Sequence, residues 1–457
     1  MTEFLHNQHP EQPVPDPFII SSFHSLLQCF AGCFTAPSMK TFEVLMTGWV
    51  LDLRRHTVTE VVRAAGAVGY KHISSFHRFF SRAQWTTDDV GLKLAAVIIE
   101  QLLPTGTIRL VVDDTLGRHT GKCIAAASMH RDPLLSTGRR PFFHWGHVWV
   151  VLSLEVTVFD KSWALPVLFR LHRSEKRCKA EGRPYEKLTE QAAELVALLA
   201  AEYPNRRFEL VGDAAYTNST LVKGRPNNMT LIGRGRLDAA LYASPPRPRK
   251  GQKGRPRVRG KRLRSPEKRA ADNHAPWRKA TVTVYGKTAV VRVLVIDALW
   301  YVVGGGERLR VIVVRDFPGH DNDDVFVCTD TSLSAEHIIE SYAKRWSLEV
   351  TFHECKGRLG FEDPCNRTER AVERTAPLAL VSYSLVVLWY VQHGQQSRAA
   401  RLPTMPWYTN KASVTFADML ATLRRASWSR RLSDPASSLR ELRKRLRPLV
   451  DYVASAA

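Results

Sequence analysis

The sequence predicts an α/β protein in which helices join the strands of a mixed β-sheet, with a helical region before the sheet and a β-rich insertion within it. Three observations lead to this fold class. Helical spacing of apolar residues continues to about residue 104, strand-like runs then alternate with helices to about residue 235, and an apolar-poor stretch interrupts that alternation before further strands. The 457 residues, 44% of them hydrophobic, suffice for two or three domains with a sizeable core.

Residues 1–104 are predicted to form a helical domain. The runs 41–55 and 87–103 carry apolar residues at three- and four-residue spacing, and Thr87-Asp88-Asp89 is a typical helix start. Between them, residues 57–85 contain two short amphipathic segments around a glycine-containing turn, and the second segment is basic. This pattern suits a helix-turn-helix DNA reader and equally suits a basic helical scaffold. We take the DNA-binding interpretation as the expectation for this domain.

Residues 105–235 are predicted to form the first part of the sheet. Their order is strand, strand, strand, helix, strand, helix, strand, which is the order of an RNase H-like fold: three antiparallel strands followed by strands parallel to the first. A mixed-sheet catalytic core of this type is therefore the predicted fold. The main segments are 107–115, 147–159, 162–171, 189–204, 206–216 and 229–235.

The core is predicted to be interrupted over residues 236–333. Residues 245–279 are rich in Pro, Gly, Arg and Lys and are expected to form a mobile basic arm, and strand-like runs after them indicate a β-rich insertion. The second part of the core follows at 334–395, where the apolar run 376–391 is too short for a membrane span and is interpreted as a buried helix. Residues 396–457 are expected to be a basic helical region.

The charge of the chain favours a polyanionic partner. Lys and Arg number 66 against 44 acidic residues, a net charge of +22, which makes nucleic acid the leading candidate, although an acidic membrane surface would also be attracted. No membrane partner is expected. No secretory signal is visible at the start, so a cytoplasmic location is expected. The seven cysteines contain no CxxC pair and are expected to stay reduced.

One segment near the end of the core carries the most specific pattern. At 100° per residue, Tyr342, Arg345, Glu349 and Lys356 fall on one face of a continuous helix, and this face places one acid among two cations and a phenol. A solvated charged face is the plain alternative. Arg345 and Lys356 are suited to neutralise phosphate oxygens, and Tyr342 can donate a hydrogen bond to a phosphate.

Aspartates follow two strands that the predicted fold makes neighbours. The first strand contains Asp113 and Asp114, and the fourth is followed by Asp213. Successive residues of a strand face opposite ways, so only one member of the first pair can point toward Asp213. With Glu349 from the helix across the sheet, three carboxylates would share one cleft, and hard cations such as Mg²⁺ prefer such oxygen ligands.

These residues resemble a known family. Tyr-x2-Arg-x3-Glu-x6-Lys at 342–356 is similar to the signature of the IS4-like bacterial insertion-sequence transposases, and VVDDT at 111–115 and LVGDAAY at 210–216 resemble their first two catalytic blocks in the family order. The helical region and the DDT block look most like the IS701-type branch. Its Asp-x-Thr spacing aligns with Asp113 and Thr115, so the resemblance implies Asp113, with Asp114 as the substitute.

The resemblance implies a DDE transposase, bacterial and nucleoid-associated when bound to DNA. In such an enzyme Asp113, Asp213 and Glu349 are the catalytic residues and hold two Mg²⁺ ions, for which Mn²⁺ can substitute: the two aspartates share one ion, and Asp113 and Glu349 bracket the other. The DNA-binding residues would be Tyr342, Arg345 and Lys356. Trp300, in the insertion, is the candidate for stacking on a flipped base, although a strand tryptophan is more often core.

The predicted activity is cut-and-paste transposition. The protein would bind double-stranded inverted repeats, hydrolyse the strands there and direct the 3′-hydroxyls at target DNA, and the family implies a homodimer on DNA. One alternative is an RNase H-like nuclease without strand transfer. Another is a domesticated, catalytically inactive DNA-binding protein, which the presence of all three acids disfavours.

Overall fold

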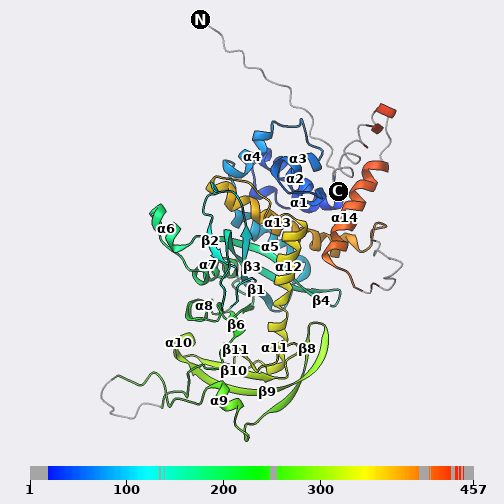
Figure 1. The fold of residues 1–457 in the computed structure, drawn as a ribbon. Helices are drawn as coiled ribbons and strands as arrows, with labels where there is room; N and C mark the ends of the chain where they lie inside the picture. The colour runs from blue at the N-terminus through cyan, green and yellow to red at the C-terminus, as the bar shows by residue number, and fades with distance from the viewer. Residues whose placement is uncertain are drawn as a thin grey trace. The chain divides into compact units, whose positions relative to one another are not determined.

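The computed structural model describes residues 19–132, 135–137, 139–246, 255–400, 411, 413–433, 438–440, 442–443 and 446. Figure 1 shows the fold of these residues. They fall into two compact units: a helical unit made of the described residues within 1–89, 123–125 and 356–457, and a sheet unit made of those within 90–122 and 126–355. Residues 90–102, which we predicted within the helical domain, therefore pack with the sheet.

The sheet unit is built on one mixed sheet, which has eleven strands in the described residues, in the order β2-β3-β1-β5-β6-β11-β10-β9-β7, with β4 paired to β3 and β8 to β9. Its strands are β1 (Ile108–Arg118), β2 (Ser128–Arg131), β3 (Phe143–Val158), β4 (Lys161–His172), β5 (Phe208–Gly212), β6 (Met229–Arg234), β7 (Leu241–Tyr242), β8 (Arg278–Val284), β9 (Lys287–Trp300), β10 (Arg308–Arg315) and β11 (Asp324–Cys328).

The predicted RNase H-like order is confirmed. β4, β3 and β1 pair antiparallel, and β5 and then β6 pair parallel beyond β1. β5 (FELVG) is buried at every position, as expected for a parallel strand covered on both faces. The helices of this unit are α5 (Thr87–Leu102), α6 (Glu175–Glu181), α7 (Leu188–Glu202), α8 (Ser219–Gly224), α9 (Pro266–Ala270), α10 (Tyr301–Gly304), α11 (Ala335–Ala343) and α12 (Trp346–Arg358).

The first strand is longer than the sequence indicated. We predicted that it would end at the two aspartates, but β1 continues to Arg118. Its parallel pairing with β5 does end at Val112. Beyond that point β3, which begins at Phe143, goes on pairing with β1 as far as Arg118, so the backbone of β1 keeps hydrogen-bond partners on one side. The aspartates therefore lie in the middle of a strand and at the end of a parallel pair.

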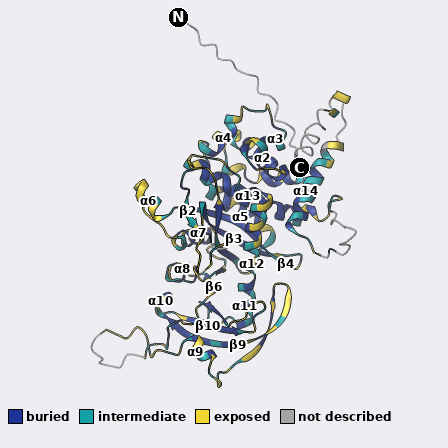
Figure 2. Cartoon of the chain, viewed as in Figure 1, coloured by how far each residue is buried: buried dark blue, intermediate teal, exposed yellow. Residues whose placement is uncertain are grey.

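The β-rich insertion extends the same sheet. β11 pairs antiparallel with β6, and β10, β9 and β8 follow outward. β8 alternates between exposed and buried residues, and the exposed edge of this hairpin is visible in Figure 2. The buried face packs against α11, where Ile338 and Ile339 join the apolar cluster of the insertion.

The predicted mobile arm is partly wrong. Residues 247–254 lie outside the described residues, but 255–279 are folded onto the insertion. Leu263 donates its backbone N–H to Leu241, and the Arg259 guanidinium lies over the Tyr242 and Tyr301 rings at 4.4 and 5.3 Å. The chain thus uses aromatic faces and backbone pairing, which a count of apolar residues does not reveal.

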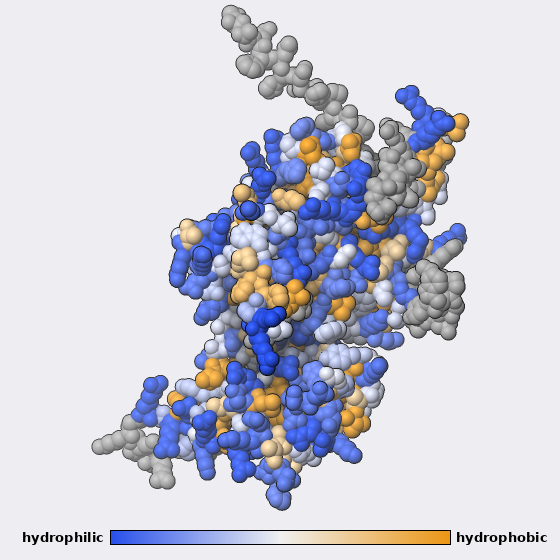
Figure 3. All heavy atoms as spheres, viewed as in Figure 1, coloured by the Kyte–Doolittle hydropathy of each residue, from blue (hydrophilic) through white to orange (hydrophobic). Residues whose placement is uncertain are grey.

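The helical unit surrounds one apolar helix. α13 is buried along most of its length, as predicted; by length and composition Glu369–Gly394 could cross a membrane, but 89% of its apolar window is buried inside the protein. On the face drawn in Figure 3, hydrophobic side chains appear only in small groups. The elements of this unit are α1 (Ser21–Gln28), η1 (Ala31–Cys33), α2 (Ala36–Leu51), α3 (Val58–Ala64), α4 (Ile73–Ser81), α13 (Glu369–Trp389), η2 (Tyr390–Gly394) and α14 (Phe416–Ser433).

Candidate active site

The two aspartates of the predicted site lie side by side because of the strand register. Val112 of β1 pairs with Gly212 of β5, so Asp113 and Asp213 are the next residues on neighbouring parallel strands. After Gly212 the chain turns, and Asp213 Oδ1 accepts the backbone N–H groups of Ala215 (2.8 Å) and Tyr216 (3.2 Å). A Cβ on Gly212 would lie 2.7 Å from the Tyr216 Cβ, so this tight turn requires glycine.

Asp113 and Asp114 face opposite sides of the sheet. Asp113 Oδ2 accepts a hydrogen bond from the Arg345 guanidinium at 2.7 Å. Asp114 Oδ1 instead accepts one from the Tyr216 hydroxyl at 2.9 Å. Asp113 is therefore the aspartate on the side of Arg345, which agrees with our choice between the two. Tyr216 was not among the predicted site residues, although it stands in the same GDAAY run as Asp213.

Glu349 joins the site through Arg345. One guanidinium nitrogen of Arg345 donates to Asp113, and the other terminal nitrogen donates to Glu349 Oε1 at 2.6 Å. The three side chains are mostly enclosed, with exposed fractions of 15% for Arg345, 16% for Asp113 and 36% for Glu349. The guanidinium therefore bridges two carboxylates that are 236 positions apart in the sequence, and it supplies positive charge between them.

The continuous helix that we assumed for residues 342–356 is wrong. α11 ends at Ala343 and α12 begins at Trp346, and the backbone N–H groups of Arg345 and Leu348 bond three residues back rather than four. This tight turn leaves Tyr342 on a separate helix, where its ring packs on Phe326 with centroids 4.7 Å apart. Lys356 remains two turns after Glu349 on the same helix, in the last turn of α12 and partly exposed.

Burial and like charges govern the electrostatics of the site. Burial, opposed by Arg345 and reinforced by Asp114 and Asp213, raises the pKa of Asp113 to about 7. Burial also raises the pKa of Asp114, while the hydrogen bond from Tyr216 acts in the opposite direction. The carboxylates of Asp113, Asp114 and Asp213 repel one another, and Arg345 offsets only part of this repulsion. The site therefore favours binding of a further cation.

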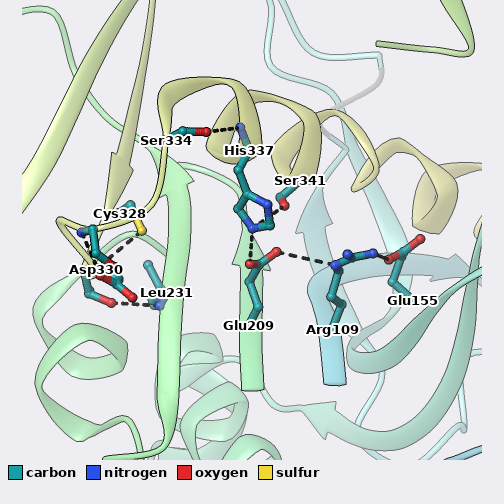
Figure 4. Close-up of polar contacts among 11 residues, drawn as sticks. Arg109, Glu155, Glu209, Leu231, Cys328, Asp330, Ser334, His337 and Ser341 are labelled. Atoms are coloured by element: carbon teal, nitrogen blue, oxygen red, sulfur yellow. Dashed lines mark hydrogen bonds and ion pairs between the residues drawn. The ribbon is translucent and has the colours of Figure 1, made fainter. Parts of the chain in front are cut away.

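A polar network anchors α11 on the same strands. Glu209 and Arg109 stand opposite each other on β5 and β1, four residues before Asp213 and Asp113. In Figure 4, His337 reaches from α11 to the buried Glu209, and Arg109 lies between Glu209 and Glu155. The His337 Nε2 to Glu209 Oε2 distance is 2.6 Å, and Arg109 donates to Glu155 Oε2 at 3.2 Å. The network ties the start of α11 to the strands that carry the aspartates.

α12 has its own attachment to the sheet. The Thr351 hydroxyl, fully buried, lies 2.9 Å from the carbonyl oxygens of Ala164 on β4 and of Ser347. Thr351 is two residues after Glu349, so this contact limits how far the Glu349 backbone can move from the sheet. The position of the third carboxylate is therefore set by one side-chain contact near the start of α11 and one in the middle of α12.

The predicted stacking residue is not available in this structure. Trp300 ends β9 and is only 5% exposed, so its ring belongs to the core of the insertion, the more common role of a strand tryptophan. Two other aromatic rings lie beside the site: Tyr285 is 51% and Trp346 53% exposed, with ring centroids 6.3 Å apart. Tyr285 and Gly286 both have positive φ, as the two-residue turn between β8 and β9 requires.

The described residues contain no group of three His, Cys, Asp or Glu side chains arranged to hold a metal ion. The donor set itself fits a hard divalent cation, because Asp113, Asp213 and Glu349 offer carboxylate oxygens, and burial raises the pKa of Asp113 despite the opposing charge of Arg345. In the structure the Arg345 guanidinium occupies oxygens of Asp113 and Glu349. The three carboxylates therefore suit a divalent cation as ligands, and the Arg345 guanidinium provides the positive charge between Asp113 and Glu349.

Comparison with known proteins gives one family match. The model of the DDE superfamily endonuclease family matches residues 29–290, which is more than half of the chain. No curated protein matches. Among solved structures, the chain is similar to the cryo-EM structure of the piggyBac transposase synaptic complex with hairpin DNA, with 11% identity and a TM-score of 0.39, over 96% of this chain and 82% of that chain.

Proposed function

The chain belongs to the DDE superfamily endonucleases, and we propose that it is a DNA transposase that cuts at inverted-repeat ends and joins the exposed 3′-hydroxyls to target DNA. The observation that carries this proposal is the meeting of Asp113 and Glu349, from opposite ends of the core, around Arg345, with Asp213 beside them. The IS4-like and IS701-type assignment belongs to the same proposal and rests on the three motif blocks.

We infer that Asp113, Asp213 and Glu349 are the catalytic carboxylates and the ligands of two Mg²⁺ ions, with Mn²⁺ as a substitute. When bound, such ions polarise the phosphate and activate water or a 3′-hydroxyl. The protein's part is to hold three carboxylates in fixed positions and to limit the access of water. The strand register, the Asp213 turn and the two anchors of the α11–α12 segment serve that purpose.

The surroundings of the carboxylates suit a DNA strand. Arg345 offers a guanidinium fork, Tyr342 a hydroxyl and Lys356 a point charge for phosphate oxygens. We assign the stacking role first given to Trp300 to the exposed pair Tyr285 and Trp346, because base stacking needs an accessible ring face.

A second surface for DNA is proposed in the helical unit. α3, the turn through Gly66 and Gly69, and α4 form a helix-turn-helix-like arrangement that packs on α2. The buried residues of α4 are three phenylalanines, while His77 and Arg78 are exposed. An exposed polar face opposite a buried aromatic one is what a helix in the major groove requires. Pairing two DNA ends would need a homodimer, which we propose for the DNA-bound state.

The proposal is tested with DNA that carries the sequences flanking the gene. The full-length protein should nick this DNA with Mg²⁺ or Mn²⁺ and join the cut ends to a target plasmid. Asp113→Asn, Asp213→Asn and Glu349→Gln should each lower the cleavage rate by at least about a hundredfold while DNA binding in gel shifts persists. Glu354→Gln, one and a half turns further along α12, is the matched control and should cleave at the wild-type rate.

Each outcome has a definite meaning. Cleavage without joined products would favour the nuclease alternative over the transposase. DNA binding without cleavage by the wild-type protein would favour the inactive DNA-binding alternative. Cleavage that survives Glu349→Gln would contradict the assignment of the third carboxylate.

A further inference from the structure

We propose that Arg234, at the end of β6, is a DNA-phosphate-binding residue of the catalytic centre and that the buried Asp324 of the β-rich insertion holds it in place. This inference rests on the proposed function, which supplies the DNA substrate. It adds a residue outside the three motif blocks and gives the insertion a direct part in forming the site.

Strand register brings Arg234 to the site. β5 and β6 pair parallel with Gly212 opposite Gly233, so Asp213 and Arg234 are the next residues on the two chains. Because β1 stands in the same register on the other side of β5, three parallel strands lead in turn to Asp113, Asp213 and Arg234. Parallel strands in register present such residues along one edge of the sheet, so a cation flanks the two catalytic aspartates.

The side chain of Arg234 faces the catalytic side of the sheet. A Cβ added to Gly233 would meet the Thr217 hydroxyl at 1.9 Å, and one added to Gly212 would meet Tyr216, so both glycines face the turn after β5. Side chains alternate along a strand, so Arg234 points the other way. On that side its cross-strand partner Phe326 packs on Tyr342, and the Arg345 guanidinium lies 5.7 Å from the Tyr342 ring centroid.

Electrostatics agrees with this placement. Burial raises the pKa of Tyr342, and the guanidinium groups of Arg345 and Arg234 both act against that rise, while Asp213 adds to it. Arg234, Arg345 and Asp213 therefore all lie close enough to influence one phenol. A phosphate next to the catalytic carboxylates would meet two guanidinium groups near this ring.

Asp324 holds Arg234 without covering it. The Asp324 side chain is 2% exposed, and one oxygen accepts a hydrogen bond from Arg234 while the other lies 2.5 Å from His320 Nδ1. The Arg234 side chain nevertheless stays 43% exposed. A guanidinium has five N–H donors, so the contact with Asp324 orients it and leaves donors for a phosphate. Asp324 begins β11, so the insertion provides this support.

Alternatively, Arg234 and Asp324 form an ordinary salt bridge that only joins β6 to β11. Arg236, two residues after Arg234, offers a matched control for this possibility. Arg236 donates to Asp238 at 2.8 Å, but that pair is 69% and 64% exposed and lacks a buried carboxylate. If Arg234 serves only as another surface pair, replacing either arginine should have the same small effect.

The test compares Arg234→Gln, Arg234→Lys and Arg236→Gln in the full-length protein, using the flanking-sequence DNA and Mg²⁺. Arg234→Gln should lower kcat/KM at least about tenfold and reduce the salt dependence of DNA binding by about one phosphate contact. Arg234→Lys keeps the charge but loses the fork, so its kcat/KM should fall at least about threefold. Arg236→Gln should match the wild type in both measurements.

DNA cleavage by the wild-type protein tests the proposed function, and cleavage by the Arg234 variants tests the role of Arg234. A wild-type protein that cuts no DNA would overturn the function itself. A wild-type protein that cuts DNA while folded Arg234→Gln retains its rate and salt dependence would overturn the role of Arg234. Thermal melting reports folding, and if Arg234→Gln does not fold, a wild-type rate for Arg234→Lys overturns the role. Asp324→Asn should lower the rate less than Arg234→Gln, because Arg234 keeps its charge but loses its ionic support; an unchanged rate would contradict the support by Asp324.

Discussion

Replacing Arg345 with glutamine is expected to destabilise the metal-free protein by about 3 kcal/mol, and to make Mg²⁺ more stabilising than it is in the wild type. The guanidinium contacts Asp113 at 2.7 Å and Glu349 at 2.6 Å, and the Arg345 and Asp113 side chains are only 15% and 16% exposed. Removing one partner of a buried pair costs about 3 to 5 kcal/mol, because the other charge stays buried without compensation.

The two contacts of Arg345 contribute unequally to the expected loss of about 3 kcal/mol. Glu349 is 36% exposed, so water screens its pair with Arg345, which adds no more than about 1 kcal/mol. The Asp113 contact therefore dominates the loss. Glutamine leaves the carboxylates without a cation, and Mg²⁺ no longer competes with a guanidinium for their oxygens. Ion binding at a hundred times the dissociation constant stabilises a fold by about 2.7 kcal/mol, which is enough to restore most of the loss.

The measurement is urea unfolding of both proteins at a pH well above the pKa of Asp113, which is about 7, so that its carboxylate is ionised, with a chelator and with Mg²⁺. Arg236→Gln, which removes an exposed pair, should change the free energy of unfolding by less than about 0.5 kcal/mol. A loss below about 1 kcal/mol for Arg345→Gln, or the same response to Mg²⁺ in both proteins, would refute the reasoning that the guanidinium substitutes for a cation.

Three further predictions concern other buried polar groups. Burial, with a smaller effect of His172, lowers the pKa of His130 from 6.5 to about 4. A lowered pKa gives stability that is present above pH 6.5 and lost as the pH falls through 4. In acid unfolding curves, the pH dependence of the free energy of unfolding should therefore differ between wild type and His130→Gln by up to about 2 kcal/mol. Tyr216→Phe removes the donor to buried Asp114 and should cost about 1.5 to 3 kcal/mol in urea unfolding, and no loss would mean that water replaces the hydroxyl. Arg374→Leu leaves the carbonyl groups of the α4–α5 connection without their guanidinium donor and should cost about 3 kcal/mol or more in thermal melts, whereas a loss below about 1 would assign those carbonyls to water.

Local patterns in the sequence predicted the fold class, and they singled out Asp113, Arg345 and Glu349, which the structure brings into contact. The RNase H-like order could be predicted because each strand and helix carries its own periodicity. Arg345 and Glu349 could be predicted to share a face because they are four residues apart, and they do so although Arg345 comes just before α12. The break between α11 and α12 could not, because the residues around it do not forbid a helix.

Burial of single residues was harder to predict. Trp300 and Trp346 differ widely in burial, since one is 5% and the other 53% exposed. Only the pairing of the insertion strands decides which ring is covered. Arg259 similarly shows why the basic arm folds back, since its partners Tyr242 and Tyr301 come from separate parts of the chain.

The residues that complete the site depend on strand register, which periodicity does not give. Asp113 and Arg345 are 232 positions apart, and their contact exists because α11 is anchored over β1 and β5. The position of Arg234 also depends on strand register, since it lies next to Asp213 only because Gly212 and Gly233 are opposite each other. Slipping β6 by one residue would turn Arg234 to the other face of the sheet and put the Gly233 position, with no side chain, toward the site. Gly212 and Gly233, which allow Tyr216 and Thr217 to approach the strands, therefore help to determine which charges surround Asp113 and Asp213.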